Sequence, residues 1–316
     1  MTQIIIIFFQ LVLGIVFLVA GAEFVTHHCI VLARHLGVRP IIVGLTVVAF
    51  GTSAPEFFVT VMANLQGQAG LAVGNIIGSN IANIGLILGV AATIMPFAVP
   101  MRLVRVELPF LVLSVILIGV ASWQGVLTRL AALVLIVSFG IYLFILFEKR
   151  GAYTQGAETE EPSESLEPRY LFRTAIIVLS FCSLIFGSHL LIKGAVSAAR
   201  LFHCPELIIG LTLTALGTSL PELASTISAL RRKETGLIIG NVLGSNFANS
   251  CGILGTAALI KPLPIDHHVL VADFPVMAAL SLALIPIFRD GKISRLEGFI
   301  LLGAYISYIA IIYLKI

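Results

Sequence analysis

Long apolar runs, separated by short breaks that contain charged residues, proline or glycine, fill almost the whole chain. A membrane-spanning helix needs about 20 mainly apolar residues, and runs of this length predict ten helices. We expect them near residues 4–33, 40–63, 71–95, 104–121, 127–147, 171–199, 206–230, 236–260, 270–288 and 296–314. The pattern therefore predicts an all-α integral membrane protein with no soluble domain of useful size.

The composition supports this prediction. Of the 316 residues, 59% are hydrophobic and 11% are charged, whereas soluble domains carry about 25% charged residues. A water-soluble globule is therefore excluded. The N-terminus lacks the basic segment and cleavage site of a signal peptide, so we expect the first apolar run to be retained as a span. The four cysteines are scattered and indicate neither a disulfide nor a metal site: Cys29, Cys182, Cys204 and Cys251.

One clearly polar connection interrupts the apolar pattern. It lies between Glu148 and Arg173 and holds six glutamates among Gly, Ser, Thr and Pro. A solvated linker is the favoured interpretation, and an ion sensor is the alternative. The chain is therefore expected to divide into residues 1–148, an acidic linker at 149–170, and residues 171–316.

The two parts on either side of the linker resemble each other in sequence. The segment GLTVVAFGTSAPE at 44–56 recurs as GLTLTALGTSLPE at 210–222, with nine of 13 positions identical. GNIIGSNIAN at 74–83 recurs as GNVLGSNFAN at 240–249, with seven of ten identical and the same offset of 166 residues. The chain is therefore a tandem duplication.

Each half is predicted to hold five helices, and this odd number makes the halves enter the membrane from opposite sides. Inverted repeats of this kind are typical of secondary transporters. Loops after the odd-numbered helices carry 14 of the 19 Lys and Arg residues. The positive-inside rule makes these loops, and with them the acidic linker, cytoplasmic, and it places both termini outside the cytoplasm. A prokaryotic inner or plasma membrane is the expected location.

Two glutamates lie alone in long uncharged stretches. Glu56 is the only Asp, Glu, Lys or Arg between residues 40 and 101, and Glu222 is the only one between residues 207 and 230. An ionised carboxylate at the centre of a membrane helix costs about 2.5–3.5 kcal/mol on insertion scales. A cation held between the two glutamates would offset this cost, and a proton on each is the alternative.

Oxygen-bearing side chains surround both glutamates. Thr52 precedes Glu56 by one helical turn, and Pro55 cannot donate to the preceding turn, so carbonyls near residues 49–51 are expected to be free for an ion. On the following helices, polar side chains recur every fourth residue: Asn75, Ser79 and Asn83, then Asn241, Ser245 and Asn249. The alternatives are a simple proline kink and interhelical hydrogen bonds from the asparagines. An all-oxygen set suits Ca²⁺ or Na⁺.

Other acidic residues are weaker candidates. Glu23, whose repeat equivalent is His189, is a candidate for lining an entrance. Glu107 and Asp273 are expected near the start of helices, where carboxylates favour the helix dipole. No hydrolase, metalloprotease or P-loop motif is found, so no enzymatic activity or ATP-driven step is expected.

The paired GTS-x-PE and GN-x-x-GSN-x-x-N segments resemble the repeats of the cation/calcium antiporters, and most closely those of prokaryotic sodium/calcium exchangers. The resemblance implies ten helices in two inverted five-helix repeats, with four broken helices around the ion sites. It also implies a ligand set. Ca²⁺ would be bound by Glu56 and Glu222 with Thr52 and Thr218; Na⁺ would be bound by Ser53, Ser79, Ser219 and Ser245; the carbonyls of Ala49 and Ala215 would contribute, and Asn83 and Asn249 would lie centrally.

Asn249 departs from some relatives, which carry Asp there, and this weakens a potassium-dependent interpretation. The sequence thus leads to the hypothesis of a secondary antiporter that exchanges Na⁺ for Ca²⁺ by alternating access in a lipid bilayer. No cofactor, nucleic acid or obligate protein partner is expected. An H⁺- or K⁺-coupled calcium antiporter remains an alternative, and a cation channel is a more remote one.

Overall fold

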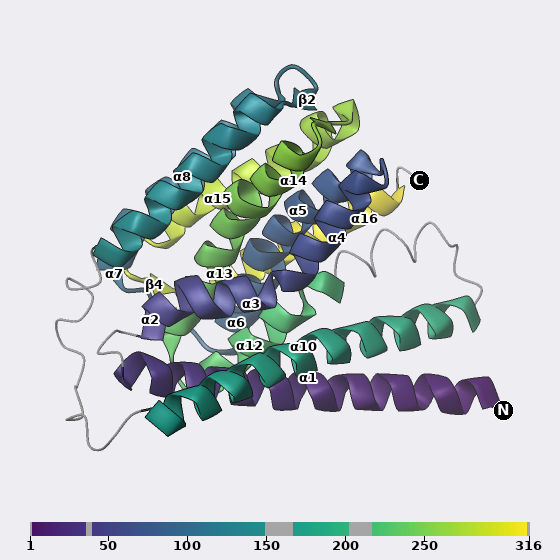
Figure 1. The fold of residues 1–316 in the computed structure, drawn as a ribbon, viewed down its shortest axis with the longest axis vertical. Coiled ribbons are helices and arrows are strands. Elements are labelled where there is room, and N and C mark those ends of the chain that lie inside the picture. Colours follow the sequence, from purple (N-terminus) through teal and green to yellow (C-terminus); the bar gives the residue numbers. More distant parts are fainter. Residues whose placement is uncertain (1, 36–39, 149–166, 202–216, 315–316) are drawn as a thin grey trace.

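The computed structural model describes residues 2–35, 40–148, 167–201 and 217–314. Almost all described residues are helical; α denotes α-helices, η π-helical segments and β short strands (Figure 1). The first half contains α1 (Thr2–His35), α2 (Pro40–Val43), η1 (Gly44–Val48), α3 (Ala49–Thr52), α4 (Ala54–Leu65), α5 (Ala69–Ile81), η2 (Ala82–Leu88), α6 (Gly89–Ile94), β1 (Phe97–Ala98), α7 (Met101–Ser122), β2 (Val126–Leu127) and α8 (Arg129–Glu148). The second half contains α10 (Glu167–Leu201), α12 (Leu220–Arg231), α13 (Thr235–Phe247), η3 (Ala248–Ile253), α14 (Leu254–Ile260), β3 (Leu263–Pro264), η4 (Val269–Asp273), α15 (Phe274–Ile287), β4 (Lys292–Ile293) and α16 (Arg295–Leu314).

Seven helices within the described ranges are long and apolar enough to cross a membrane, or eight if a bent pair is counted as one span. The predicted helix at 206–230 begins outside the described residues, and most of the predicted linker at 149–170 lies outside them too. α10 begins at Glu167, which is earlier than predicted.

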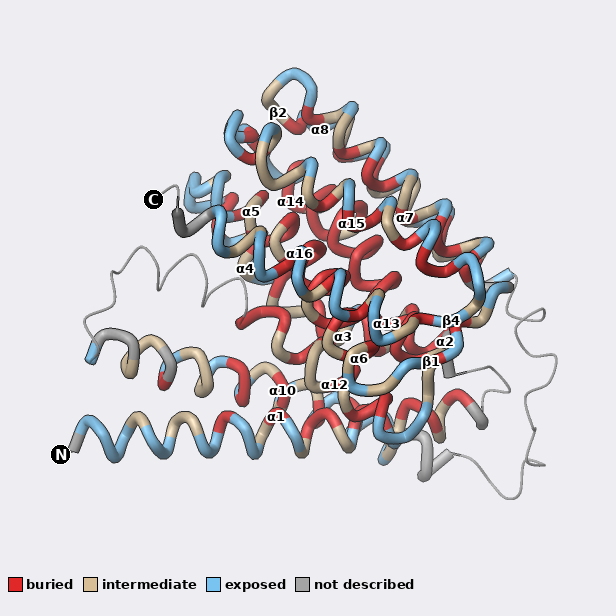
Figure 2. Tube along the Cα trace, turned by 180° about the vertical axis from the view of Figure 1, so that it is seen from behind, coloured by how far each residue is buried: buried red, intermediate tan, exposed pale blue. Residues whose placement is uncertain are grey.

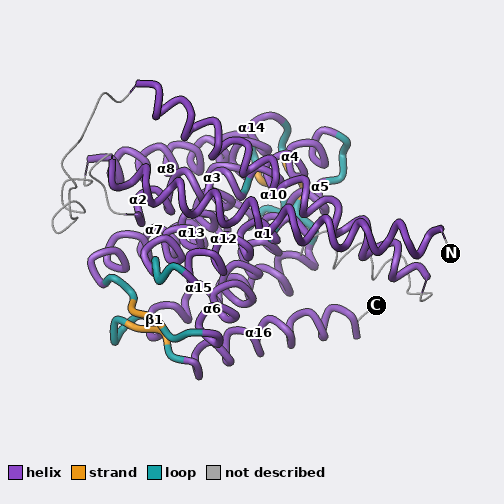
Figure 3. The backbone as a smooth tube through the Cα atoms, turned by 90° about the horizontal axis from the view of Figure 1, so that it is seen from below, coloured by secondary structure: helices purple, strands orange, loops and turns teal. Residues whose placement is uncertain are grey.

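α1 and α10 form a long antiparallel pair along one side of the other helices (Figures 1 and 3). Glycines allow their backbones to approach closely, as small residues do between membrane helices. A Cβ atom added at Gly14 would lie 2.7 Å from the backbone nitrogen of Leu191, and one added at Gly187 would lie 2.8 Å from that of Leu18. The two helices therefore behave as one packed unit.

The central helices are the most deeply buried part of the molecule (Figure 2). In the most apolar 18 residues of Thr235–Ile260, 94% of the residues are buried, and in those of Ala69–Ile94 the share is 78%. The corresponding share in Gln3–Ala33 is 17%. Both central spans are continuous, and each passes through a π-helical segment. The expectation of four broken helices is therefore wrong for these two spans. Their sequences contain no internal proline, and a π-turn accommodates an extra residue without ending the helix.

In the first half, the helix that comes before the span Ala69–Ile94 is broken. The segment Gly44–Thr52 meets Ala54–Leu65 at an angle of 50°. The break lies at Ser53, whose ψ of 8° is non-helical, and its repeat equivalent Ser219 has a ψ of 1°. In both halves the residue two positions later is proline, which is favourable in the first turn of the new helix. The GTS-x-PE motif thus starts a new helix with its glutamate in the first turn.

The two halves exchange equivalent contacts. β1 pairs with β4, and β2 pairs with β3, both antiparallel. Adding 166 to the residue numbers of β1 and β2 gives those of β3 and β4, so the two pairings are repeat equivalents of one another. Gly89 packs closely against Leu302, and the equivalent Gly255 packs against Ile136. Each half therefore completes the other at corresponding places.

The glycine contact between α1 and α10 generates a stability prediction. We expect Gly187→Ala to lower the stability by about 1–3 kcal/mol, because the new methyl group overlaps backbone atoms of α1 that cannot move aside. Thermal unfolding of the purified protein in detergent measures this. Gly140→Ala is the matched control, since no atom lies within 4 Å of its added Cβ and alanine has the higher helix propensity. Equal unfolding temperatures for the two variants would contradict the prediction.

Candidate ion-binding site

Glu56 and Glu222 lie in the first turns of α4 and α12, at the centre of the protein. Both are completely buried, with 0% and 1% of their surface exposed. The carboxylates are near enough for the charge of Glu222 to act on Glu56. Among ion pairs between described residues, none includes either glutamate. Two like charges are thus brought together in an apolar interior without a basic side chain.

Serine hydroxyls donate to one oxygen of each carboxylate. The Ser79 hydroxyl lies 3.3 Å from Oε1 of Glu56, and the Ser53 hydroxyl lies 3.1 Å from Oε1 of Glu222. The second oxygen of each glutamate is buried and has no hydrogen-bond partner among the described residues. A buried carboxylate oxygen without a donor is costly. Each glutamate therefore leaves one oxygen that a cation or a proton would satisfy.

The threonines link the two halves through asparagines. The Thr52 hydroxyl donates to the Val48 carbonyl one turn earlier at 2.9 Å and also lies 3.3 Å from Oδ1 of Asn241, and the repeat-equivalent Thr218 hydroxyl lies 3.4 Å from Oδ1 of Asn75. The hydroxyls of Thr52 and Thr218 also lie close enough to the carboxylate of the opposite half to act on its charge. Thr52 and Thr218 therefore lie at the carboxylate pair, as expected from their spacing.

The asparagines behave as interhelical connectors. The Asn75 amide donates to Thr60 at 3.0 Å and to the Glu56 carbonyl at 3.3 Å. Asn241 donates to Ser225 and Thr226, each at 3.4 Å. With both donors and the acceptor engaged, these two side chains hold neighbouring helices and their hydroxyls in place.

The expectation of free carbonyls before the proline is wrong for Ala49. Its carbonyl accepts from the backbone nitrogen of Ser53 at 3.1 Å and lies 3.4 Å from the Thr52 hydroxyl. Ser245 from the other half reaches the same oxygen at 3.5 Å. The helix continues as far as Ser53, so the Ala49 carbonyl stays paired within the turn. Ala215, the repeat equivalent of Ala49, lies outside the described residues, and the Ser219 hydroxyl is buried without a partner.

A cluster of asparagines lies beyond the glutamates. Asn83 donates to Oδ1 of Asn246 at 3.0 Å, and Asn80 donates to the Ser250 hydroxyl at 2.7 Å. Both polar atoms of Asn249 are buried and lack a partner. Asn83 and Asn249 are thus both buried, whereas Asn80 and Asn246 were missed from the sequence. Both belong to the repeated GSN motif, but they fall outside the four-residue spacing on which the site was predicted.

The helix-dipole interpretation of Glu107 is wrong. Glu107 lies beyond the first turn of α7, is buried, and interacts with Tyr142 of α8. Asp273 ends η4 and accepts from Tyr308 of α16 at 3.0 Å. Tyr142 and Tyr308 are repeat equivalents, so each half pairs its carboxyl group with a tyrosine of its last helix.

Comparison with known proteins identifies the family. The model of the family described as sodium/calcium exchanger protein matches residues 6–148 and 172–314. This chain belongs to that family. The two matched segments begin and end 166 residues apart, which is the offset between the repeated motifs.

Relatives and solved structures agree with this assignment. The putative antiporter CaxA of Alkalimonas amylolytica is 37% identical over 93% of this chain and 95% of its own. The sodium/calcium exchanger MaX1 of Methanosarcina acetivorans is 31% identical over 97% and 98%. A structure of the sodium-calcium exchanger NCX_Mj, soaked with 10 mM Na⁺ and no Ca²⁺, superposes with a TM-score of 0.85 at 33% identity, covering 97% and 98% of the two chains. This family member is therefore a membrane antiporter and not an enzyme.

The cross-half hydrogen bonds generate a prediction about the frame of the site. We expect Asn241→Ala to lower the stability by about 1–3 kcal/mol, because the buried Ser225 and Thr226 hydroxyls lose a donor and the contact with Thr52 of the other half is lost. Combining it with Thr52→Val should cost less than the sum of the single changes, and thermal unfolding measures this coupling. Thr256→Ala is the control, since that hydroxyl bonds only the carbonyl of Gly252 in its own helix. Strict additivity would contradict the link.

Proposed function

We propose that this chain exchanges Na⁺ for Ca²⁺ across the membrane by alternating access. The observation that carries the proposal is the pair of buried glutamates, Glu56 and Glu222, each with one unpartnered oxygen. The family assignment supports antiport, and MaX1 and NCX_Mj are both named as sodium/calcium exchangers. In this proposal Ca²⁺ and Na⁺ are substrates, and the lipid bilayer is the only other partner.

Ca²⁺ would lie between the two glutamates. It commonly takes six to eight oxygen ligands, and two carboxylates with the hydroxyls of Thr52 and Thr218 supply a large part of such a shell. Both hydroxyls lie near enough to the carboxylate of the opposite half to act on its charge. A Ca²⁺ ion there would be held by both repeats at once, so that its binding stabilises one relative arrangement of the halves.

Na⁺ would occupy positions on either side of the Ca²⁺ site. We assign one position to Ser53 and Ser79, and the other to Ser219 and Ser245, with carbonyl oxygens at 49 and 215. Ser53 and Ser79 lie against the two carboxylates, and Ser245 lies against the Ala49 carbonyl. Na⁺ binding at Ala49 requires that carbonyl to exchange its present hydrogen bonds for the ion. Asn83 and Asn249 would complete the central region.

Charge balance in the pocket would couple the movement of Na⁺ to that of Ca²⁺. Two ionised glutamates supply a charge of −2, which one Ca²⁺ or two Na⁺ neutralise. A loaded pocket is then free to pass through an occluded state, whereas an empty, charged pocket resists the desolvation that passage requires. The protein therefore exchanges one ion set for the other without a leak of either.

Inverted repeats would provide the alternation. We propose ten spans, arranged as two inverted five-helix repeats at 1–148 and 171–316, with a cytoplasmic linker at 149–170 and extracytoplasmic termini. The family matches at the 166-residue offset support the duplication, and the exchanged strand pairs β1–β4 and β2–β3 support a two-fold relation. The α1–α10 pair would move against the remaining helices.

Proton coupling is the second candidate, because the unpartnered oxygens of Glu56 and Glu222 suit protons as well as cations. Coupling to K⁺ and passive conduction are further alternatives. Uptake of ⁴⁵Ca²⁺ into proteoliposomes with separate Na⁺, K⁺ and H⁺ gradients separates them. Uptake driven by Na⁺ alone supports the proposal, uptake driven by a pH gradient without Na⁺ supports proton coupling, and flux that needs no counter-ion gradient indicates a channel.

Neutralising either glutamate should abolish exchange. We expect Glu56→Gln and Glu222→Gln each to reduce Na⁺-driven Ca²⁺ uptake at least about 100-fold, because a buried charge-bearing ligand is lost at the point where the ion lies. Glu148→Gln, at an exposed position at the end of α8, serves as the control. Wild-type flux in either of the first two variants would rule out the mechanism.

Ion binding should also be visible without transport. A ligand present at 100 times its dissociation constant stabilises the protein by about 2.7 kcal/mol. We therefore expect Ca²⁺ and Na⁺ each to raise the thermal unfolding temperature in detergent, and Na⁺ to shift the Ca²⁺ titration to higher concentrations. Glu56→Gln should lose both the Ca²⁺ response and this competition. Independent, non-competing responses would contradict overlapping sites.

A further inference from the structure

The α1–α10 pair covers the two halves of the molecule to different extents. α1 packs along α12, whereas α10, the repeat equivalent of α1, makes no comparable contact with α4 within the described residues. The outer face of α4 is correspondingly open, with Phe58 64% and Met62 50% exposed. Their repeat equivalents on α12 are Ala224, which is partly buried, and Ser228, which is 2% exposed. The α1–α10 pair therefore covers one half of the core and leaves the corresponding face of the other uncovered.

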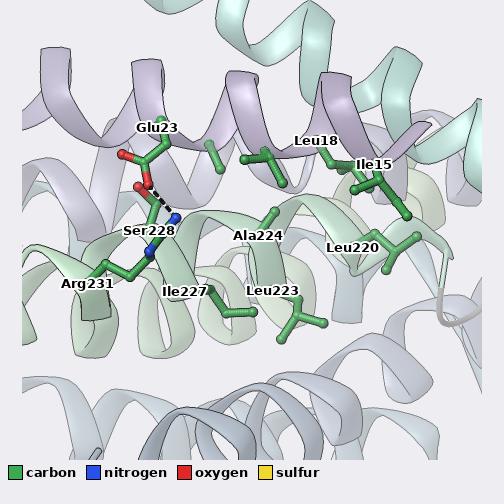
Figure 4. A pocket seen from close by; sticks show the side chains of 11 residues that line it. Ile15, Leu18, Glu23, Leu220, Leu223, Ala224, Ile227, Ser228 and Arg231 are labelled. Atoms are coloured by element: carbon green, nitrogen blue, oxygen red, sulfur yellow. Dashed lines mark hydrogen bonds and ion pairs between the residues drawn. The ribbon is translucent and has the colours of Figure 1, made fainter. Parts of the chain in front are cut away.

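The contact between α1 and α12 includes a partly open, apolar cavity. This cavity of about 190 Å³ separates the two helices (Figure 4). Its walls are almost entirely apolar and are formed mainly by Ile15, Leu18, Leu220, Leu223 and Ile227. Apolar contacts of this kind are non-directional, so they do not by themselves hold α1 in one register.

An ion-pair cluster lies at one end of this cavity. Oε2 of Glu23 lies 2.8 Å from a guanidinium nitrogen of Arg232, and Oε1 lies 3.4 Å from one of Arg231. His27, one turn further along α1, lies 3.5 Å from Arg232. Glu23 reaches from α1 to the end of α12, where the chain turns toward α13 (Figure 4). Directional polar contacts therefore hold α1 at this end of the contact.

The opposite half has no residues for an equivalent cluster. Adding or subtracting 166 places His189 at the position of Glu23, and Leu65 and Gln66 at those of Arg231 and Arg232. If α10 covered α4 as α1 now covers α12, none of these side chains would form a carboxylate–guanidinium pair. The duplicated fold thus carries this cluster on one side only.

We propose that the Glu23–Arg231–Arg232 cluster is a lock that holds α1 on α12 and biases the protein toward the described conformation. The proposal rests on the alternating access proposed above, in which the mirror conformation covers α4 instead of α12. Both pairs are partly exposed, with 33% of the Glu23 side chain accessible, and exposed pairs are weak. The lock therefore shifts the ratio of the two conformations about two- to fivefold, and no more.

Spin-label distance measurements on the full chain test the lock without requiring transport. One label is placed at the native exposed Cys182 of α10 and the other at Met62→Cys of α4, after Cys29, Cys204 and Cys251 are replaced. The mirror conformation should appear as a second population of label-to-label distances. Glu23→Gln, and Arg231→Gln combined with Arg232→Gln, should each increase this second population about two- to fivefold. Because the interaction is between exposed charges, 1 M salt should give the wild type a similar increase.

A transplanted lock tests the same idea from the other side. His189→Glu combined with Gln66→Arg builds an equivalent pair on α10 and α4, and it should raise the second population even with Glu23 intact. Arg129→Gln is the matched control, since this exposed arginine contacts the Ile260 carbonyl, away from α1 and α12. An unchanged distribution in the Glu23, Arg231–Arg232 and transplanted variants would overturn the lock. If the variants show the expected distance changes but the wild type shows no Na⁺-driven Ca²⁺ flux, the proposed exchange is overturned and the lock is not.

Discussion

The burial of two carboxylates without a basic partner is the constraint on which the rest of the structure depends. Glu56 and Glu222 lie in the most enclosed part of a protein that is otherwise almost free of charge inside. Water cannot solvate them and no described arginine or lysine pairs with them. The surrounding helices must therefore bring polar groups to these carboxylates, and among the described residues one oxygen of each glutamate is left without a partner, where we propose that a transported ion binds.

This constraint explains why the halves are interlocked. A single repeat supplies one carboxylate and too few oxygens for a Ca²⁺ shell. The hydroxyls of Ser53, Thr52 and Thr218 instead interact across the boundary between the halves, and Asn75 and Asn241 hold these threonines from the opposite side. The same exchange recurs at the periphery, where the short strands of one half pair with those of the other. The site and the fold therefore share one two-fold organisation.

The sequence predicts the features that depend on a strong local signal. Glu56 and Glu222 stand out because a lone charge in an apolar run has few explanations, and Thr52 follows from its position one helical turn away. A proline kink was the alternative interpretation of the motif, and the breaks at Ser53 and Ser219 lie two residues before the prolines. These predictions needed only the spacing of residues on one helix.

Features that depend on three-dimensional packing were not predictable in this way. Whether the Ala49 carbonyl is free depends on where the helix actually ends, and it remains paired because the turn is kept up to Ser53. Asn246 lies off the four-residue stripe, and its contact with Asn83 comes from another helix. Glu107 was assigned to a helix start, but its partner Tyr142 lies on the next helix and has no local sequence signal.

Duplication makes departures from symmetry informative. Identical halves would give two mirror conformations of equal energy, so any preference must come from positions at which the halves differ. The ion site is nearly symmetric in its glutamates, threonines and serines, yet the Ser53 hydroxyl bonds a carboxylate while that of Ser219 has no partner. Larger differences lie at the contact with the α1–α10 pair, where Glu23, Arg231 and Arg232 have the equivalents His189, Leu65 and Gln66. The conserved pattern of the repeat thus provides the shared ion chemistry, and the residues that break the pattern set which side the protein prefers to close.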